Sequence, residues 1–122
     1  MATLVVNAGK AVIANRVKGT GTEPAHVAWG TGAGTTAVTD TTLFTEASET
    51  RVAGTSTIVT TTVTDDTYQV VGTLTANASK TITNAGTFDA STSGNLFVKG
   101  DFTGVALDNG ESIQFTIKMQ VQ

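Results

Sequence analysis

The C-terminal half of the sequence alternates between apolar and polar residues, which is the period of strands with one buried face. The alternation is most regular in Ser112–Val121, where every second position is apolar. These positions are Ile113, Phe115, Ile117, Met119 and Val121. Further strands are predicted over Thr55–Thr64, Tyr68–Ala76 and Lys80–Phe88, and another begins with Leu96–Val98. Turn residues at Asp65–Asp66, Asp89–Gly94 and Asp108–Gly110 separate the strands, so we expect antiparallel pairing.

The N-terminal part predicts a short strand followed by a helix. Thr3–Val6 has the composition of an edge strand, and Asn7 is a typical helix N-cap. We expect the helix over Ala8–Lys18, ended by Gly19 in the left-handed conformation. Its inward face is predicted to hold Ala8, Ala11, Val12 and Val17. Val12-Ile13 is also compatible with a strand.

The middle of the chain predicts one strand and one long loop. His26–Gly30 has strand composition and leads into the glycine-rich bend Gly30–Gly34. From Thr35 to Thr50 the sequence is polar, and Leu43-Phe44 is its main apolar anchor. We therefore expect a long loop that these two side chains hold against the core.

Together these segments predict an all-β fold: an antiparallel β-sandwich or small barrel with one short N-terminal helix. The length suits a single β-sandwich domain over residues 1–122 with a short N-terminal arm. The residues expected to matter structurally are Trp29, Gly30, Gly32, Leu43, Phe88 and Phe115.

The composition restricts the class of function. Only 14% of residues are charged, and threonine occupies about a fifth of the positions. A partner protein could therefore bind this surface with little desolvation of charged side chains. The seven basic residues are dispersed and the net charge is −3, which argues against nucleic-acid binding. Cysteine is absent, and no apolar run approaches the ~18 residues of a membrane span. No signal-peptide pattern is present at the start, so we expect synthesis in the cytoplasm and no entry into the secretory route.

Candidate chemistry is sparse. His26 is the single histidine, and a half-buried strand residue beside Trp29 explains it better than catalysis. The Gly30–Gly34 segment lacks the Gly-Lys-Ser/Thr ending of a phosphate loop. Asp65-Asp66 and Asp108–Glu111 lack the alternating oxygen spacing of a calcium loop. Without a secretory signal, Asn77-Ala78-Ser79 is a chance match to a glycosylation site. We predict no catalytic, cofactor-binding or metal-binding residue and no enzymatic activity.

Three segments of the chain resemble the small virion structural proteins of tailed bacteriophages, in particular the β-sandwich proteins that decorate capsids. The first runs from Asn7–Arg16 through His26–Gly32, with its Trp-Gly-Thr-Gly element, to Asp40–Leu43 and Glu46. The second comprises Ile82–Ala90 and Leu96–Val98. The third comprises Leu107, Gly110–Ile113 and the alternating strand after them. In the second segment Asn84 and Thr87 replace an acidic and an aliphatic residue that the family usually has.

The resemblance implies a capsid decoration (cement) protein, made in the bacterial host cytoplasm, that binds the outer surface of the shell of major capsid protein and stabilises it. It also implies a homo-oligomer, a trimer or a dimer. As the interface we expect the edge strand Thr3, Leu4, Val5 and Val6, which could extend a neighbouring sheet. The alternative is a receptor-binding module of a tail fibre or baseplate, for which Trp29 would have to be exposed.

Overall fold

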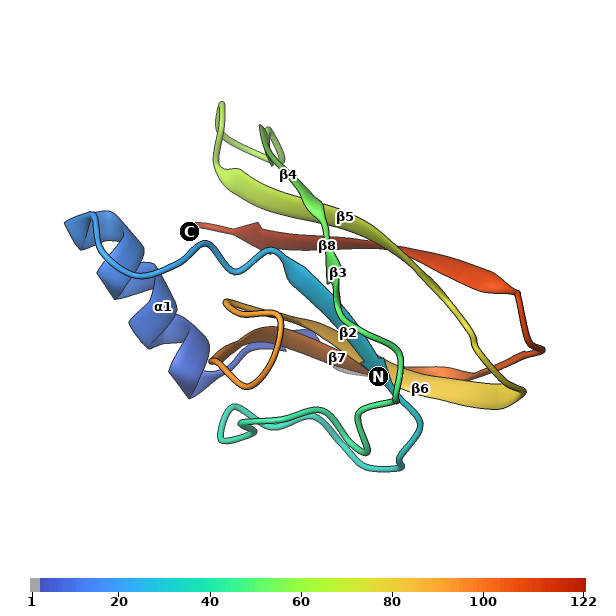
Figure 1. Cartoon of the computed structure of the whole chain (residues 1–122). Coiled ribbons are helices and arrows are strands. Elements are labelled where there is room, and N and C mark those ends of the chain that lie inside the picture. Colours follow the sequence, from blue (N-terminus) through green and yellow to red (C-terminus); the bar gives the residue numbers. More distant parts are fainter. Residues whose placement is uncertain (1–2) are drawn as a thin grey trace.

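Two antiparallel sheets packed face to face, with one helix at one end, make up the computed structural model (Figure 1). It describes residues 3–122. The elements in chain order are β1 (Thr3–Val5), α1 (Asn7–Lys18), β2 (His26–Gly30), β3 (Val52–Ala53), β4 (Thr55–Val59), β5 (Thr67–Thr75), β6 (Lys80–Phe88), β7 (Leu96–Leu107) and β8 (Ser112–Gln120). The predicted all-β sandwich with one short helix is confirmed. Within residues 3–122 no strand pairing joins the two sheets into a closed barrel.

The larger of the two sheets has five strands in the order β1-β7-β6-β2-β3, and the small sheet has three in the order β4-β5-β8. Every pair of neighbours is antiparallel. In the small sheet β5 and β8 pair without interruption from Thr67↔Gln120 to Thr75↔Ser112. In the large sheet the pairing of β6 with β7 shifts at two places, between Ile82 and Asn84 and between Gly86 and Phe88.

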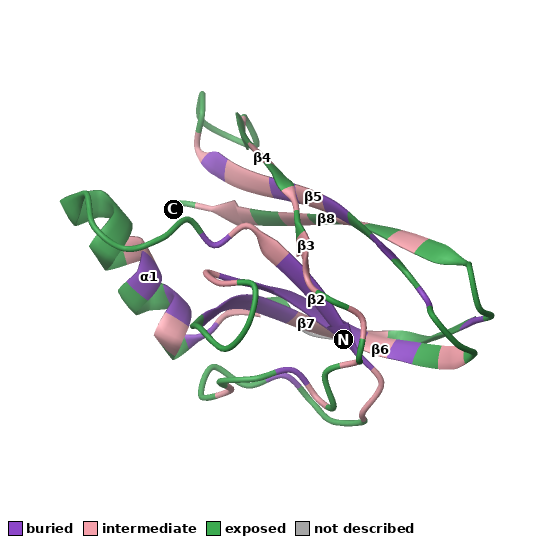
Figure 2. Ribbon diagram, viewed as in Figure 1, coloured by how far each residue is buried: buried purple, intermediate pink, exposed green. Residues whose placement is uncertain are grey.

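The main core lies between the sheets and follows from the period-two pattern. Its fully buried side chains come from β2, β5 and β6, and they include Val27, Trp29, Val70, Leu74 and Ile82. A second cluster lies on the other face of the large sheet and contains Val6, Ala28, Leu43, Phe88 and Leu96. The long segment 31–51 covers that face (Figure 1). The large sheet is therefore buried on both faces, whereas the small sheet has one wet face (Figure 2).

The helix begins one residue earlier than predicted. Asn7 is its first residue and Val6 takes the cap position, in an extended conformation and without a side-chain hydrogen bond to the helix. Tertiary contacts fix this start: the Val6 side chain is fully buried, and its N–H donates to the carbonyl oxygen of Phe97. The prediction that Gly19 ends the helix is confirmed, since its φ is +89° and its N–H donates to the Arg16 carbonyl.

The predicted inward face of α1 is only partly correct. Val12 is buried and Ala8 is half-buried, but Ala11 is exposed and Val17 is 84% exposed. Gly9 is the other buried position, and its Cα lies directly against the backbone of Phe97 in β7. The axis of the helix is thus set by a contact at Gly9, and the last turn, with Val17, projects beyond the sheets.

The strand predicted over Thr55–Thr64 ends early, at Val59. Residues 60–66 form a loop because the Asp66 carboxylate accepts hydrogen bonds from the backbone N–H groups of Thr61, Thr62 and Val63. These bonds, from Val63 and Thr61 above all, hold the pKa of Asp66 well below its ordinary value. At the same end of the small sheet β8 stops at Gln120, which pairs with Thr67, and Val121, predicted to face inward, is 65% exposed.

Candidate protein-binding surfaces

The residues predicted to be structural lie in two places. Trp29 is 1% exposed, and its ring meets that of Phe115 edge-on, with centroids 6.3 Å apart. Leu43 and Phe88 belong to the cluster on the other face of the large sheet. Gly30 and Gly32 lie under residues 44 and 45 of the loop, where an added Cβ would collide with the Phe44 carbonyl or the Thr45 hydroxyl. All six residues therefore form or border packed interiors.

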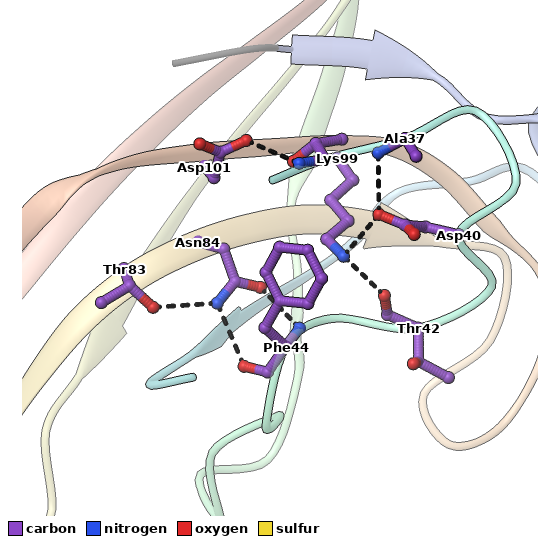
Figure 3. Close-up of polar contacts among 9 residues, drawn as sticks. Ala37, Asp40, Thr42, Phe44, Thr83, Asn84, Lys99 and Asp101 are labelled. Carbon is purple, nitrogen blue, oxygen red and sulfur yellow. Dashed lines mark hydrogen bonds and ion pairs between the residues drawn. The ribbon is translucent and has the colours of Figure 1, made fainter. Parts of the chain in front are cut away.

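Segment 31–51 is fastened to the large sheet through an amide side chain that sequence reasoning missed. Asn84 of β6 is fully buried, accepts a hydrogen bond from the Phe44 N–H at 3.0 Å and donates one to the Phe44 carbonyl at 3.1 Å (Figure 3). The amide thus replaces the pairing partner that a strand would have given Phe44. The loop has no regular secondary structure of its own, yet the N–H and carbonyl groups of Phe44 both have hydrogen-bond partners.

A buried lysine makes the second attachment. Lys99 of β7 has no exposed surface, and its ammonium donates to Asp40 at 2.9 Å and to the Thr42 carbonyl at 3.0 Å (Figure 3). The hydrogen bond from Lys99 and a second from the Ala37 N–H lower the pKa of Asp40. A buried charge is tolerated only when it is paired and hydrogen-bonded, and both conditions are met here.

Glu49 and Arg51 hold the far end of the segment. Glu49 accepts hydrogen bonds from the Trp29 indole N–H, the Asn77 N–H and the Lys80 ammonium. Burial alone would raise the pKa of Glu49, but these donors outweigh it and lower the pKa to about 2. Arg51 forms an ion pair with Glu46 and donates hydrogen bonds to two carbonyls of the 89–95 turn. Its guanidinium carbon also lies 3.6 Å from the centroid of the Phe88 ring.

The predicted interface strand lies at the edge of the large sheet. Thr3, Leu4 and Val5 pair with Gly100, Lys99 and Val98 of β7. Among the described residues no strand pairs with the outer edge of β1. Val6 differs from the other three, because its side chain is fully buried next to Ala28 and Leu43. Val6 therefore contributes to the core and not to a partner surface.

An apolar groove that sequence reasoning did not find lies between α1 and the near end of the small sheet. Its volume is about 410 Å³. The side chains that line it are Val12, Ile13, Arg16, Val17, Glu23, Pro24, Ile58, Tyr68, Phe97, Met119 and Val121. Three of them are large, apolar and more than half exposed: Val17 at 84%, Ile58 at 59% and Val121 at 65%. Surface apolar residues gathered in this way mark interaction sites in soluble proteins.

The charged residues that line the groove are Arg16 and Glu23, one of each sign, but the helix beside it is basic. Helix α1 carries Lys10, Arg16 and Lys18 and no acidic residue, although the whole chain has a net charge of −3. The Tyr68 hydroxyl oxygen is buried and makes no hydrogen bond among the described residues. Burial raises the pKa of Tyr68 to about 12, and the negative charge of Glu23 adds to this. The groove thus offers apolar side chains below a basic helix.

No protein-family model, curated protein or solved structure matches the chain. The part of the chain that the structure describes contains no group of three or more His, Asp or Glu side chains placed to hold a metal ion. Nor is its one helix long and apolar enough to cross a membrane.

His26 lies in β2 and is half-buried, and its Nδ1 is buried without a hydrogen-bond partner among residues 3–122.

Proposed function

We propose that the protein is a capsid decoration protein of a tailed bacteriophage, which binds the outer surface of the major capsid shell and stabilises it. The observation that carries the proposal is the apolar groove below the basic helix α1. The resemblance of the Trp-Gly-Thr-Gly and Phe-Asp-Ala segments to virion structural proteins supports it. The partner is the major capsid protein, and the location is the surface of the virion.

The groove defines the chemistry of the contact on the capsid. Val17, Ile58 and Val121 fit an apolar segment, and Arg16 and Lys18 at the end of α1 fit acidic residues beside it. Each such contact is modest in area. Because it is repeated over a shell, and because an oligomer holds several subunits at once, avidity would raise the overall affinity.

The burial of Trp29 weighs against the alternative, a receptor-binding module of a tail fibre or baseplate. Aromatic side chains that bind glycans must present a ring face to solvent. Trp29 is 1% exposed, and its indole N–H is already bonded to Glu49. A role in binding other proteins of the particle does not need an exposed Trp29, because the groove beside α1 provides the contact surface.

The test is sedimentation of the purified protein with phage heads that lack it. Two variants, Val17→Glu and Ile58→Glu, place a charge in the groove and should weaken binding to heads at least tenfold. Val63→Glu is the matched control, because Val63 is 66% exposed and lies outside the groove. It should bind like the wild type. Equal binding by all three variants would exclude the groove as the contact surface.

A count of copies per particle tests the function separately from the groove. Quantitative mass spectrometry of intact virions should find this chain in hundreds of copies if it covers the shell. Copies in single digits or low tens would place it in the tail, and the decoration role would then be abandoned.

A further inference from the structure

Strand β8 is a long edge without the usual protection. It pairs with β5 on one side, and within residues 3–122 no strand pairs with its other side (Figure 1). Its nine residues contain no proline, no register shift and one charge, Lys118. Soluble proteins normally shorten, bend or charge such an edge, because its free N–H and C=O groups pair with other chains.

The inner face of β8 is also incompletely covered. Ile113, Phe115, Ile117 and Met119 point toward the large sheet, yet all four are only half-buried (Figure 2). In the neighbouring strand β5, by contrast, Val70 and Leu74 are each 1% exposed. A cavity of about 170 Å³ opens between β8 and the β1–β7 edge, and Phe102, Phe115 and Ile117 line it. The sandwich is thus open along β8, where one more strand would cover apolar surface.

We propose that this strand is β8 of a second copy of the chain. The two β8 strands pair antiparallel about a two-fold axis at Thr116, and the two small sheets become one sheet of six strands. This inference does not depend on the proposed capsid function. It concerns self-association, whereas the groove beside α1 concerns a different partner.

The sequence of β8 is complementary to itself in this arrangement. Only the register centred on Thr116 pairs all nine residues, from Ser112 opposite Gln120 onward. On the inner face Phe115 then meets Ile117 of the other copy, and Ile113 meets Met119. On the outer face Lys118 meets Gln114 and never its own copy, so no like charges oppose one another. Such a contact is isologous, as a two-fold dimer requires.

Light scattering after size-exclusion chromatography and sedimentation equilibrium test the dimer. The wild type should have twice the 12.4 kDa mass of the chain. Thr116 is exposed in the single chain, so Thr116→Glu and Thr116→Lys should fold normally. Each variant places two like charges on the axis and should raise the dimer dissociation constant at least tenfold. An equimolar mixture of the two should dimerise again, because glutamate then faces lysine.

The matched control is Thr57→Glu, an exposed threonine on β4 at the opposite edge of the same sheet. It should leave the dimer unchanged. Thermal unfolding of every variant verifies the fold, and hydrogen exchange should show slower exchange for β8 amides at high protein concentration. A wild type that remains monomeric at about 100 µM, even if β8 binds another protein, overturns the proposal. So does a Thr116→Glu variant that dimerises as strongly as the wild type.

Discussion

The ammonium nitrogen of Lys99 lies 3.2 Å from the centroid of the Phe44 ring, and Asp40 balances its charge from the same loop. A residue of β7 is thereby attached to an aromatic ring, a carboxylate and a backbone carbonyl that all belong to segment 31–51. A cation over an aromatic ring is stabilised further when water is excluded. The loop and the large sheet therefore stabilise one another through a single buried charge.

Substitution of Asp40 should cost more than the loss of one surface ion pair. In Asp40→Asn the Lys99 ammonium stays buried without an anion, so we expect the free energy of unfolding to fall by about 3 kcal/mol. Lys99→Met combined with Asp40→Asn removes both charges and should recover part of that loss. Urea unfolding of the two single variants and the double variant measures the coupling. Strictly additive effects would show that the two side chains do not interact.

Stability should decrease in acid as Glu49 becomes protonated. Its pKa is lowered from 4.5 to about 2, so its contribution is complete above about pH 4.5 and is lost as the pH falls toward 2. We expect a loss of about 2 kcal/mol over this range, less than the full linkage value because solvent screens part of the charge. Urea unfolding between pH 5 and pH 2 measures the decline.

The variant Glu49→Gln removes the titrating group and should flatten this pH dependence, while lowering stability at pH 7. Asp65→Asn is the matched control, since Asp65 is exposed and asparagine tolerates its φ of +60°. It should retain the wild-type decline. If Glu49→Gln showed an unchanged slope, the acid sensitivity would belong to other carboxylates, such as Asp40 or Asp66.

Gly9→Ala should destabilise the protein even though alanine favours helices by about 1 kcal/mol over glycine. A methyl group at Gly9 would collide with the carbonyl group of Phe97, which is backbone and has no room to move aside. The helix would have to shift away from β7, at a net cost of about 2 kcal/mol. Lys10→Ala on the exposed side of the same helix should change stability by a few tenths only. Thermal unfolding distinguishes the two, and a stabilised Gly9→Ala would refute the close contact.

The fluorescence of Trp29 should be that of a fully buried indole. Trp29 is the single tryptophan and is 1% exposed, so its emission should be blue-shifted and resistant to acrylamide. Unfolding in urea should shift the emission to the red and restore quenching. Efficient quenching in the native protein would mean that the ring lies in an accessible site.

Local pattern predicts most of the fold because turn residues bound the strands and because the strands of the small sheet bury one face. The pattern predicts strands β2, β5, β6 and β8 and the helix at nearly correct positions. The errors lie where side chains compete with backbone pairing: Asp66 captures the N–H groups that would have extended β4. Strand β3 has only two residues, too few for a recognisable pattern. The spacing of Val17 predicts an inward side chain, because spacing along the helix does not show where the sheets end.

The attachment of the long loop was beyond prediction for a different reason. Lys99 and Asp40 are 59 positions apart in the chain, and Asn84 and Phe44 are 40 apart. Nothing in the alternation of β7 distinguishes a buried lysine from one that faces water. The groove beside α1 was missed likewise, because it is assembled from separate elements. A feature of the sequence that points to this surface is the exclusively basic charge of the helix.

Because segment 31–51 is attached to β6 and β7, its place in the order of folding can be predicted. The residues that hold it, Asn84 and Lys99, lie much later in the sequence. They reach their positions only when β6 and β7 have paired. The segment therefore has to close large loops in the chain before it gains its contacts with Asn84 and Lys99. We expect it to settle last during refolding and to open first when the protein is warmed, ahead of the strands beneath it.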